Sequence, residues 1–182
     1  TFLSTLPGWA ATLARTVAAK QANTFVIHGL PADLIPVRRE SGLAFELLDS
    51  FLTDALFASW PSKITYNRAD RLKAYDAVHG TSWGEALPRD AANAFALLDS
   101  YFRHCATLAP ARPVVLILPF AETLVPNGDA SYRTPEDRAV LVYLRKWAQD
   151  PVLLAKNIVV VLVTESLAEL DPKLVRASAT RE

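Results

Sequence analysis

The sequence predicts an α/β fold in three layers, with helices on both faces of a parallel sheet. The first observation is a set of apolar runs too dense for strands that have one face in water. They lie at residues 24–28, 114–118 and 158–163, and such runs are typical of strands buried on both faces. The second observation is that the stretches between them carry apolar residues three and four positions apart, as amphipathic helices do. Alternating strands and helices favour a parallel sheet covered on both sides.

The first half of the chain supplies two of the expected helices, at residues 1–22 and 43–57, where apolar side chains share one helical face. The strand at 24–28 lies between them. Residues 63–66 predict a second, more polar strand, which we place near the edge of the sheet. Residues 67–88 carry no regular pattern, so we expect a loop with at most a short helix.

The second half contains the clearest helix, at residues 90–108, and another that begins at Thr134. The buried strand at 158–163 follows. After it, Asp171 is suited to the N-cap of a short helix, and Pro172 to its first turn. A buried strand that leads into a loop and a helix places the loop at the edge where α/β proteins hold ligands.

Composition limits the classes of function. The 182 residues fit one domain, and 19 Lys and Arg balance 19 Asp and Glu, which argues against a nucleic-acid partner. The single cysteine, Cys105, excludes an internal disulfide and a cysteine metal cage, and suits a reducing compartment. No apolar run reaches the length of a membrane span, and no signal peptide is visible. We therefore expect a cytoplasmic domain with no membrane partner.

In the segment 157–176, the apolar run is followed by Thr164 and then by Leu170, Asp171, Pro172, Leu174 and Arg176. This pattern resembles the sensor-1 strand and following helix of AAA+ ATPases. The family pattern is an apolar run, Thr-Asn, and then Leu-Asp-Pro-Ala-Leu-Leu-Arg. The order of the four strands also follows the family, so the resemblance covers about residues 6–176 and implies a sheet of the P-loop NTPase type. One position departs from the family pattern, because Glu165 stands where the family has Asn.

The resemblance implies a phosphate-binding loop after the first strand. Such a loop needs glycines whose N–H groups approach phosphate, a lysine for the terminal phosphates and a hydroxyl for Mg²⁺. Only the first glycine, Gly29, is present, no lysine follows, and Asp33 would repel phosphate. If a nucleotide binds at all, we expect contacts with backbone groups at Gly29 and Leu30 and with Thr164.

The resemblance also implies two carboxylates at the end of the third strand, one for Mg²⁺ and one for the attacking water. Pro119 and Phe120 occupy both positions, and only a downstream acid, Glu122, remains. Without the lysine and both carboxylates, phosphoryl transfer has no route. We therefore expect a degenerate AAA+ domain, a pseudo-ATPase with no catalytic residue and no cofactor or metal of its own.

The resemblance extends to the inactive half of bacterial two-part AAA proteins, whose ATP and Mg²⁺ are bound by a catalytic module elsewhere in the polypeptide. It implies an N-terminal fragment that supports assembly or recruits a protein partner or client, as a homo-oligomer with AAA+-type contacts. The chain is expected to end before the fifth strand and the helical lid. Arg176 matches the first of two arginines that point to a neighbouring subunit's nucleotide, but Ala179 occupies the second position. Arg176 is thus an interface candidate, beside the simpler interpretation as a solvated helix residue.

Two alternatives stay open: a nucleotide-binding domain with an atypical phosphate loop, and a stand-alone domain of the flavodoxin or receiver type. Strand order separates the last from the AAA+ interpretation, which requires strand 114–118 to lie between the first and second strands. Asp33, Glu122 and Glu165 could converge on a cation, although a solvated acidic rim is the simpler interpretation. His28 is expected to be a hydrogen-bonded packing residue.

Two further features invite a functional interpretation. His104 and Cys105 are neighbours on a helix and diverge too far for a dyad. The motifs at residues 79–80 and 83–84 (His-Gly and Trp-Gly) could belong to a binding loop, but a surface turn is the simpler interpretation.

Overall fold

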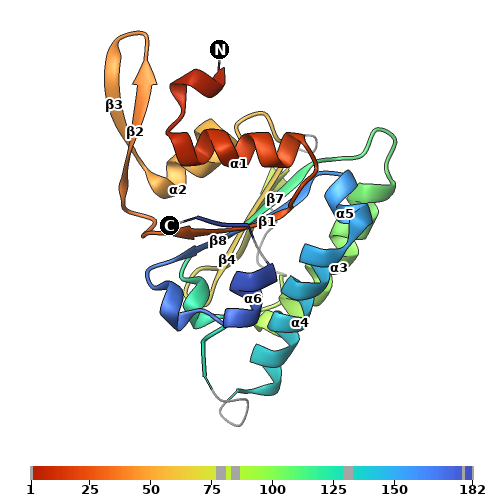
Figure 1. The fold of residues 1–182 in the computed structure, drawn as a ribbon. Helices are drawn as coiled ribbons and strands as arrows, with labels where there is room; N and C mark the ends of the chain where they lie inside the picture. Colours follow the sequence, from red (N-terminus) through yellow and green to blue (C-terminus); the bar gives the residue numbers. More distant parts are fainter. Residues whose placement is uncertain (1, 77–80, 83–86, 129–132, 178, 182) are drawn as a thin grey trace.

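The computed structural model describes residues 2–76, 81–82, 87–128, 133–177 and 179–181. A central sheet with strand order β6-β5-β4-β7-β8-β1-β9 separates two layers of helices (Figure 1). The three-layer α/β fold is thus confirmed. The parallel strands are β1 (Thr24–His28), β4 (Ser62–Asn67), β7 (Val114–Leu118), β8 (Ile158–Thr164) and β9 (Ala179–Arg181).

Strand order decides between the alternative folds. β7 and β8 lie between β4 and β1, so the third parallel strand stands between the first and second, as the AAA+ interpretation requires. A flavodoxin-like or receiver-like order, with the first strand between the second and third, is excluded. β9 pairs in parallel with β1. The expectation that the chain ends before a fifth strand was therefore wrong, because three residues are too few to give a recognisable apolar pattern.

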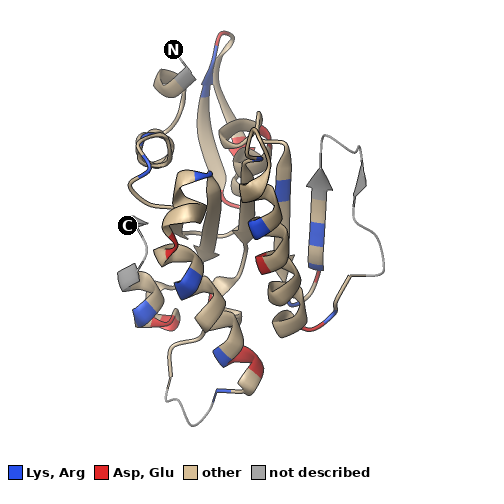
Figure 2. Ribbon diagram, turned by 90° about the vertical axis from the view of Figure 1, so that its right-hand side faces the viewer, with Lys and Arg blue, Asp and Glu red and all other residues tan. Residues whose placement is uncertain are grey.

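The sheet continues beyond β4 through two antiparallel strands, β5 (Arg71–Asp76) and β6 (Thr81–Ser82). The expectations of a strand near the sheet edge at 63–66 and of a loop with at most a short helix at 67–88 were both wrong. In β5 the buried Leu72 and Ala74 alternate with exposed basic residues, which appear blue in Figure 2. One face of β5 covers the core and the other is polar, so the strand lacks the dense apolar run of its buried neighbours.

Helices cover the sheet on both faces (Figure 1). One apolar core lies under the N-terminal helices and the other under the longer helices of the opposite layer. None of the helices within the described residues is both long and apolar enough to cross a membrane. The first layer holds η1 (Phe2–Thr5), α1 (Gly8–Ala18), α2 (Leu48–Phe51) and the π-helix η2 (Leu52–Leu56), and the second holds α3 (Ala91–Thr107), α4 (Pro135–Gln149), α5 (Pro151–Ala155) and α6 (Pro172–Ala177).

The predicted helix starts in the second half agree with the structure. The Asn93 N–H donates to Asp90 Oδ1 at 2.9 Å, which caps α3. Thr134 and Asp137 form a reciprocal capping box at the start of α4. The Lys173 N–H donates to Asp171 Oδ1 at 2.8 Å, which confirms the predicted cap of α6.

A separate β-hairpin, β2 (Leu34–Arg39) and β3 (Gly42–Leu47), extends from the body of the domain at the top left of Figure 1. The helix predicted at 43–57 is therefore wrong for its first third, and helical structure begins at Leu48. Leucines at 43, 47 and 48 fit a helical face, but residues 42–47 also alternate at the strand period. Gly42, at φ +118°, closes a turn that a helix would not contain.

Candidate functional site

The candidate site is the edge where the parallel strands β1, β8 and β7 end. His28 at the end of β1 is paired in register with Thr164 at the end of β8. Leu118 at the end of β7 is paired with Leu162 of β8. The loops after these strands are therefore neighbours, and this edge is where open α/β sheets place their ligands. Two short 3₁₀ helices follow β7 and β8, namely η3 (Ala121–Thr123) and η5 (Leu167–Glu169).

The first N–H groups of the loop after β1 donate hydrogen bonds to other groups of the same chain. The Gly29 N–H donates to the Thr164 carbonyl at 2.8 Å, and the Leu30 N–H donates to Asp33 Oδ2 at 2.8 Å. A Cβ on Gly29 would lie 2.9 Å from the same carboxylate oxygen, so the carboxylate occupies the space beside the glycine. A phosphate-binding loop leaves such N–H groups open to an anion. Here an internal carboxylate accepts from one of them.

The same loop is also fastened to the helix behind it. The Leu48 N–H donates to the Asp33 carbonyl at 2.8 Å, and the Asp49 N–H donates to the Pro31 carbonyl at 3.1 Å. In phosphate-binding folds, the first N–H groups of this helix face the anion. In this chain the hairpin separates the loop from α2, and these two donors bind loop carbonyls.

The loop after β7 carries no carboxylate at the two positions where a nucleotide hydrolase would need them. Pro119 is buried. Phe120 is 42% exposed and adopts a left-handed backbone, with φ 55° and ψ 44°. The nearest acid along this loop, Glu122, accepts a hydrogen bond from Thr164 Oγ1 at 2.8 Å.

Thr164 is fully buried at the end of β8. Its hydroxyl lies between Glu122 Oε2 and the Ser166 carbonyl, at 2.8 and 3.0 Å, and also accepts from the Ser166 N–H at 3.3 Å. The hydroxyl is therefore engaged by the protein itself. Of the residues predicted to contact a nucleotide, all three use their polar groups within the fold.

Asp33, Glu122 and Glu165, which could have converged on a cation, do not form such a cluster in the described structure. His28 Nε2 is 2.8 Å from the Glu165 carbonyl oxygen, as the predicted hydrogen-bonded role requires, although His28 is exposed. In the described part of the chain, no three His, Cys, Asp or Glu side chains gather closely enough to hold a metal ion. His104 is exposed and Cys105 is buried, so their side chains diverge.

Some of the singled-out residues are not covered by the structure. The backbone of Arg176 lies in α6, but its side chain is outside the described residues. The motifs at 79–80 and 83–84 are also outside the described residues.

A cavity of about 180 Å³ opens between the loops after β1 and β7 and the end of β4. Pockets for ligands the size of a nucleotide are larger, at about 300–1,000 Å³. Within the lining, the Asn67 amide donates to Asp70 at 3.1 Å, and this bond, with the Lys73 ammonium, lowers the pKa of the Asp70 carboxyl. The lining residues are Pro31, Asp49, Thr65, Asn67, Asp70, Lys73, Pro119 and Phe120.

A larger hollow, of about 500 Å³, lies against η2 on the polar face of β4 and β5. It shares Thr65 and Lys73 with the smaller cavity, but its lining includes no residue of the loops after β1 and β7. It is therefore not the site that the strand order predicts.

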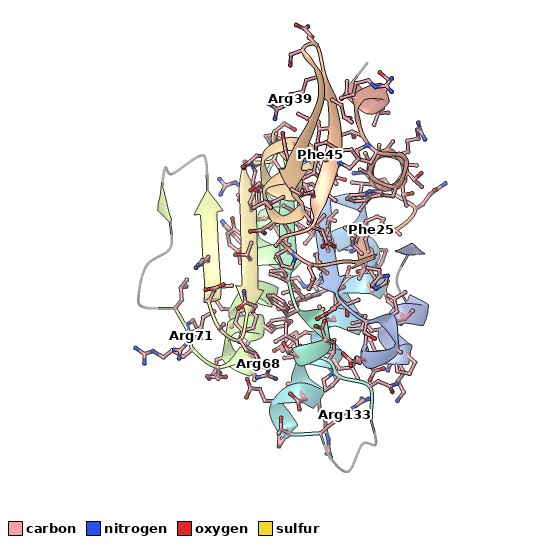
Figure 3. All side chains as sticks on the ribbon, turned by 90° about the vertical axis from the view of Figure 1, so that its left-hand side faces the viewer. Phe25, Arg39, Phe45, Arg68, Arg71 and Arg133 are labelled. Atoms are coloured by element: carbon pink, nitrogen blue, oxygen red, sulfur yellow. The ribbon has the colours of Figure 1, made fainter. Side chains whose placement is uncertain are left out.

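Two arginines that the sequence did not single out fix the loops around the site (Figure 3). Arg68 donates to the Thr123 carbonyl at 2.9 Å and to Asp137 Oδ1 at 2.7 Å, which joins η3 to α4. Arg133 Nη2 lies 2.5 Å from Asp171 Oδ2, and in this ion pair the Asp171 side chain is 1% exposed and the Arg133 side chain 15%. The pair is not aligned as a hydrogen bond, because neither Asp171 Oδ2 nor Arg133 Nε has a hydrogen-bond partner in the described structure. Both pairings join positions far apart in sequence, so local patterns could not predict them.

Comparison with known proteins identifies the family. A family profile described as "AAA+ chaperone, N-terminal Rossmann-like domain" matches residues 1–182. The chain belongs to this family. The resemblance to AAA+ proteins is thus confirmed, and the structure is that of the N-terminal domain of an AAA+ chaperone.

Among solved structures, the AAA+ chaperone domain is similar to a chain in "Structure of E. coli MS115-1 HORMA:CdnC:Trip13 complex". The two are 23% identical, with a TM-score of 0.36, and the match covers 54% of this chain and 32% of that one. The matched part is about a third of the length of the Escherichia coli chain. No curated protein matches the domain significantly.

Proposed function

We propose that this domain is a non-catalytic part of its AAA+ chaperone, which supports assembly or recruits a protein partner for an ATPase module elsewhere in the polypeptide. The observation that carries the proposal is the hydrogen bond from the Leu30 N–H to Asp33 Oδ2. A phosphate at this loop would have to displace a carboxylate of its own charge. No lysine in the loop would compensate that displacement.

The other parts of the site support the same proposal. Pro119 and Phe120 leave Mg²⁺ and an attacking water without carboxylates, and Thr164 is engaged by Glu122. The residues present therefore do not fit a bound nucleotide, and we derive no catalytic step for the domain. ATP and Mg²⁺ belong, in this proposal, to the attached module.

Assembly is the second element of the proposal. AAA+ proteins act as oligomers, and α6 carries Arg176 at the position that resembles the family's intersubunit arginine. We therefore assign Arg176 to a contact between copies. Arg176→Ala should shift sedimentation of the full-length chaperone towards smaller assemblies, and unchanged sedimentation would remove Arg176 from the interface.

Calorimetric titration tests the absence of nucleotide binding. ATP with Mg²⁺, titrated into the 182-residue chain, should give no saturable heat. Saturable binding with a Kd in the micromolar range would overturn the proposal and favour a nucleotide-binding domain with an atypical loop. The chain with the Asp33→Ala change is a useful companion, because removal of the carboxylate alone should not create binding in the absence of a lysine.

A further inference from the structure

The hairpin of β2 and β3 has two unlike faces. Residues directly opposite one another in an antiparallel pair lie on the same face, and one face includes Val37, which is buried in the core. The other face, here called the outer face, is exposed at every one of its positions. It consists of the three register pairs Leu34–Leu47, Pro36–Phe45 and Arg38–Leu43.

The outer face is strongly apolar for a solvent-exposed surface. Leu34 is 65% exposed, Leu43 66%, Phe45 59% and Leu47 46%. These are half of the large apolar side chains that are exposed in the described part of the domain. Scattered exposed leucines are ordinary, but a gathered set on one projecting element marks an interaction surface (Figure 3 labels Phe45).

The backbone of β3 can also accept a further strand. Pro36 has no N–H, so its pair with Phe45 must be of the non-hydrogen-bonded type. The N–H and C=O of Phe45 therefore point away from β2. Within the described residues, β3 pairs with no strand other than β2, so this edge is open to an extended segment.

The charges on the hairpin favour a bound segment with an acidic side chain. Arg39 forms an ion pair with Glu46 on the inner face of the hairpin. Arg38 lies on the outer face, exposed, and has no ion pair with any residue that the structure describes. An acidic side chain on a bound segment would find Arg38 beside Leu43 on the same face.

The size of the outer face selects the kind of occupant. Each partner of a stable protein–protein interface contributes about 20–30 residues, whereas the outer face has the six residues of its three pairs. It is too small to hold a second copy of the domain by itself. A short extended segment needs no larger surface, because main-chain hydrogen bonds to an open edge supply part of its affinity.

We propose that the outer face binds an extended apolar segment of another polypeptide that carries an acidic residue, by addition of a strand beside β3. This inference rests on the recruitment role proposed above and names the surface and the chemistry of the partner. The apolar side chains of the segment, at alternate positions, pack on Leu43, Phe45 and Leu47. Its carboxylate pairs with Arg38.

A peptide pool tests the inference with the full chain. The pool holds peptides of about ten residues, the length of a long strand, with Val, Leu or Phe at alternate positions and one Asp or Glu. Peptides from the pool that the chain retains should bind it saturably when their binding is measured by fluorescence anisotropy. Leu43→Ser with Phe45→Ser should weaken binding by at least about tenfold. Val142→Ser is the matched control, because Val142 is 63% exposed on α4, away from the hairpin, and should leave binding unchanged.

Charge reversal and self-association complete the test. Arg38→Glu should weaken binding of the acidic peptides and strengthen binding of versions with Lys in place of the acid. Retention of no peptide, or equal binding by the double variant, would overturn the inference. Concentration-dependent dimerisation abolished by the double variant would also overturn it, in favour of a second copy. Binding should be unaffected by ATP and Mg²⁺, so failure here leaves the calorimetric test of the nucleotide site independent.

Discussion

The Leu30 N–H donates to Asp33 Oδ2 at 2.8 Å, and so a carboxylate closes the loop that follows the first strand of the sheet. The position is the one at which related folds present N–H groups to phosphate. The Leu30 N–H already has an acceptor within its own chain, so an anion that binds this loop has to compete with the Asp33 carboxylate. In the function proposed above, structural hydrogen bonds of this kind take the place of contacts with a nucleotide.

A double-mutant cycle measures this closure. Asp33→Ala leaves the Leu30 N–H without its acceptor and should lower the free energy of unfolding by about 1 kcal/mol. Gly29→Ala places a Cβ 2.9 Å from the carboxylate and should also destabilise. Because the clash involves Asp33 itself, Gly29→Ala should cost less in the Asp33→Ala background, as measured by urea unfolding.

Asp54→Ala is the control for the cycle, since Asp54 lies on η2, outside the loop. It should change stability by less than about 0.5 kcal/mol. Fully additive effects of Gly29→Ala and Asp33→Ala would contradict the contact on which the cycle depends.

Restoring the missing carboxylates should not restore an enzyme. Pro119 is buried, so Pro119→Asp should destabilise by at least about 2 kcal/mol. Phe120→Glu should cost less, because Phe120 is 42% exposed. The double variant should have a lowered Tm and release no phosphate from ATP, because the loop after β1 still lacks a lysine. Phosphate release above that of the unmodified chain would contradict this account, because it would show that turnover does not require a lysine in the loop after β1.

The buried ion pair between Arg133 and Asp171 should be the more costly of two pairs to break. Asp171→Asn leaves the Arg133 guanidinium, on a side chain that is only 15% exposed, without its counter-charge and should lower the free energy of unfolding by about 3 kcal/mol. Glu46→Gln removes the partner of the more exposed Arg39 and should cost less than about 1 kcal/mol. Equal effects in chemical denaturation would mean that the Arg133 pair is solvated.

Alkaline pH should destabilise the domain through Tyr101. Burial raises the pKa of the Tyr101 phenol to about 12, and its oxygen lies 2.7 Å from Ser62 Oγ. Since the folded pKa is above the unfolded value near 10, the stabilising contribution is complete below pH 10 and is lost as the pH rises towards 12. Unfolding measured between about pH 9 and pH 11 should show a steeper loss than in Tyr101→Phe. The control variant Tyr143→Phe should retain the steep loss, and parallel profiles for all three proteins would exclude Tyr101 as the source.

Sequence patterns predicted the buried centre of the fold and failed at its margins. β7 and β8 are buried along their whole length, so their apolar runs were unambiguous. β5 packs only one of its faces on the core, β9 has only three residues, and most positions of the hairpin are exposed, so none of them carries a dense apolar run. The helix predicted at 43–57 shows the limit clearly, because Leu43 and Leu47 fit both periods and only pairing with β2 decides between them.

For the candidate site, local sequence predicted which groups are missing but not what replaces them. The absence of a lysine and of carboxylates at Pro119 and Phe120 is visible in the chain. The bond from Thr164 to Glu122 joins residues 42 positions apart, and such pairings depend on the assembled sheet. Asp33 was read as a repulsive charge, whereas the structure also makes it an acceptor within the loop.

The most direct measurement of the central claim follows the amide resonances of Gly29 and Leu30 in the ¹⁵N-labelled chain during titration with ATP and Mg²⁺. The account predicts that both resonances keep their positions up to about 1 mM nucleotide, a concentration at which even binding with a millimolar Kd would be detected. The reason is that the Gly29 and Leu30 N–H groups donate to the Thr164 carbonyl and to Asp33. Titration with Mg²⁺ alone supplies the baseline. Saturable shifts of both resonances with ATP and Mg²⁺, beyond that baseline, would show that the loop still receives phosphate and would contradict the account.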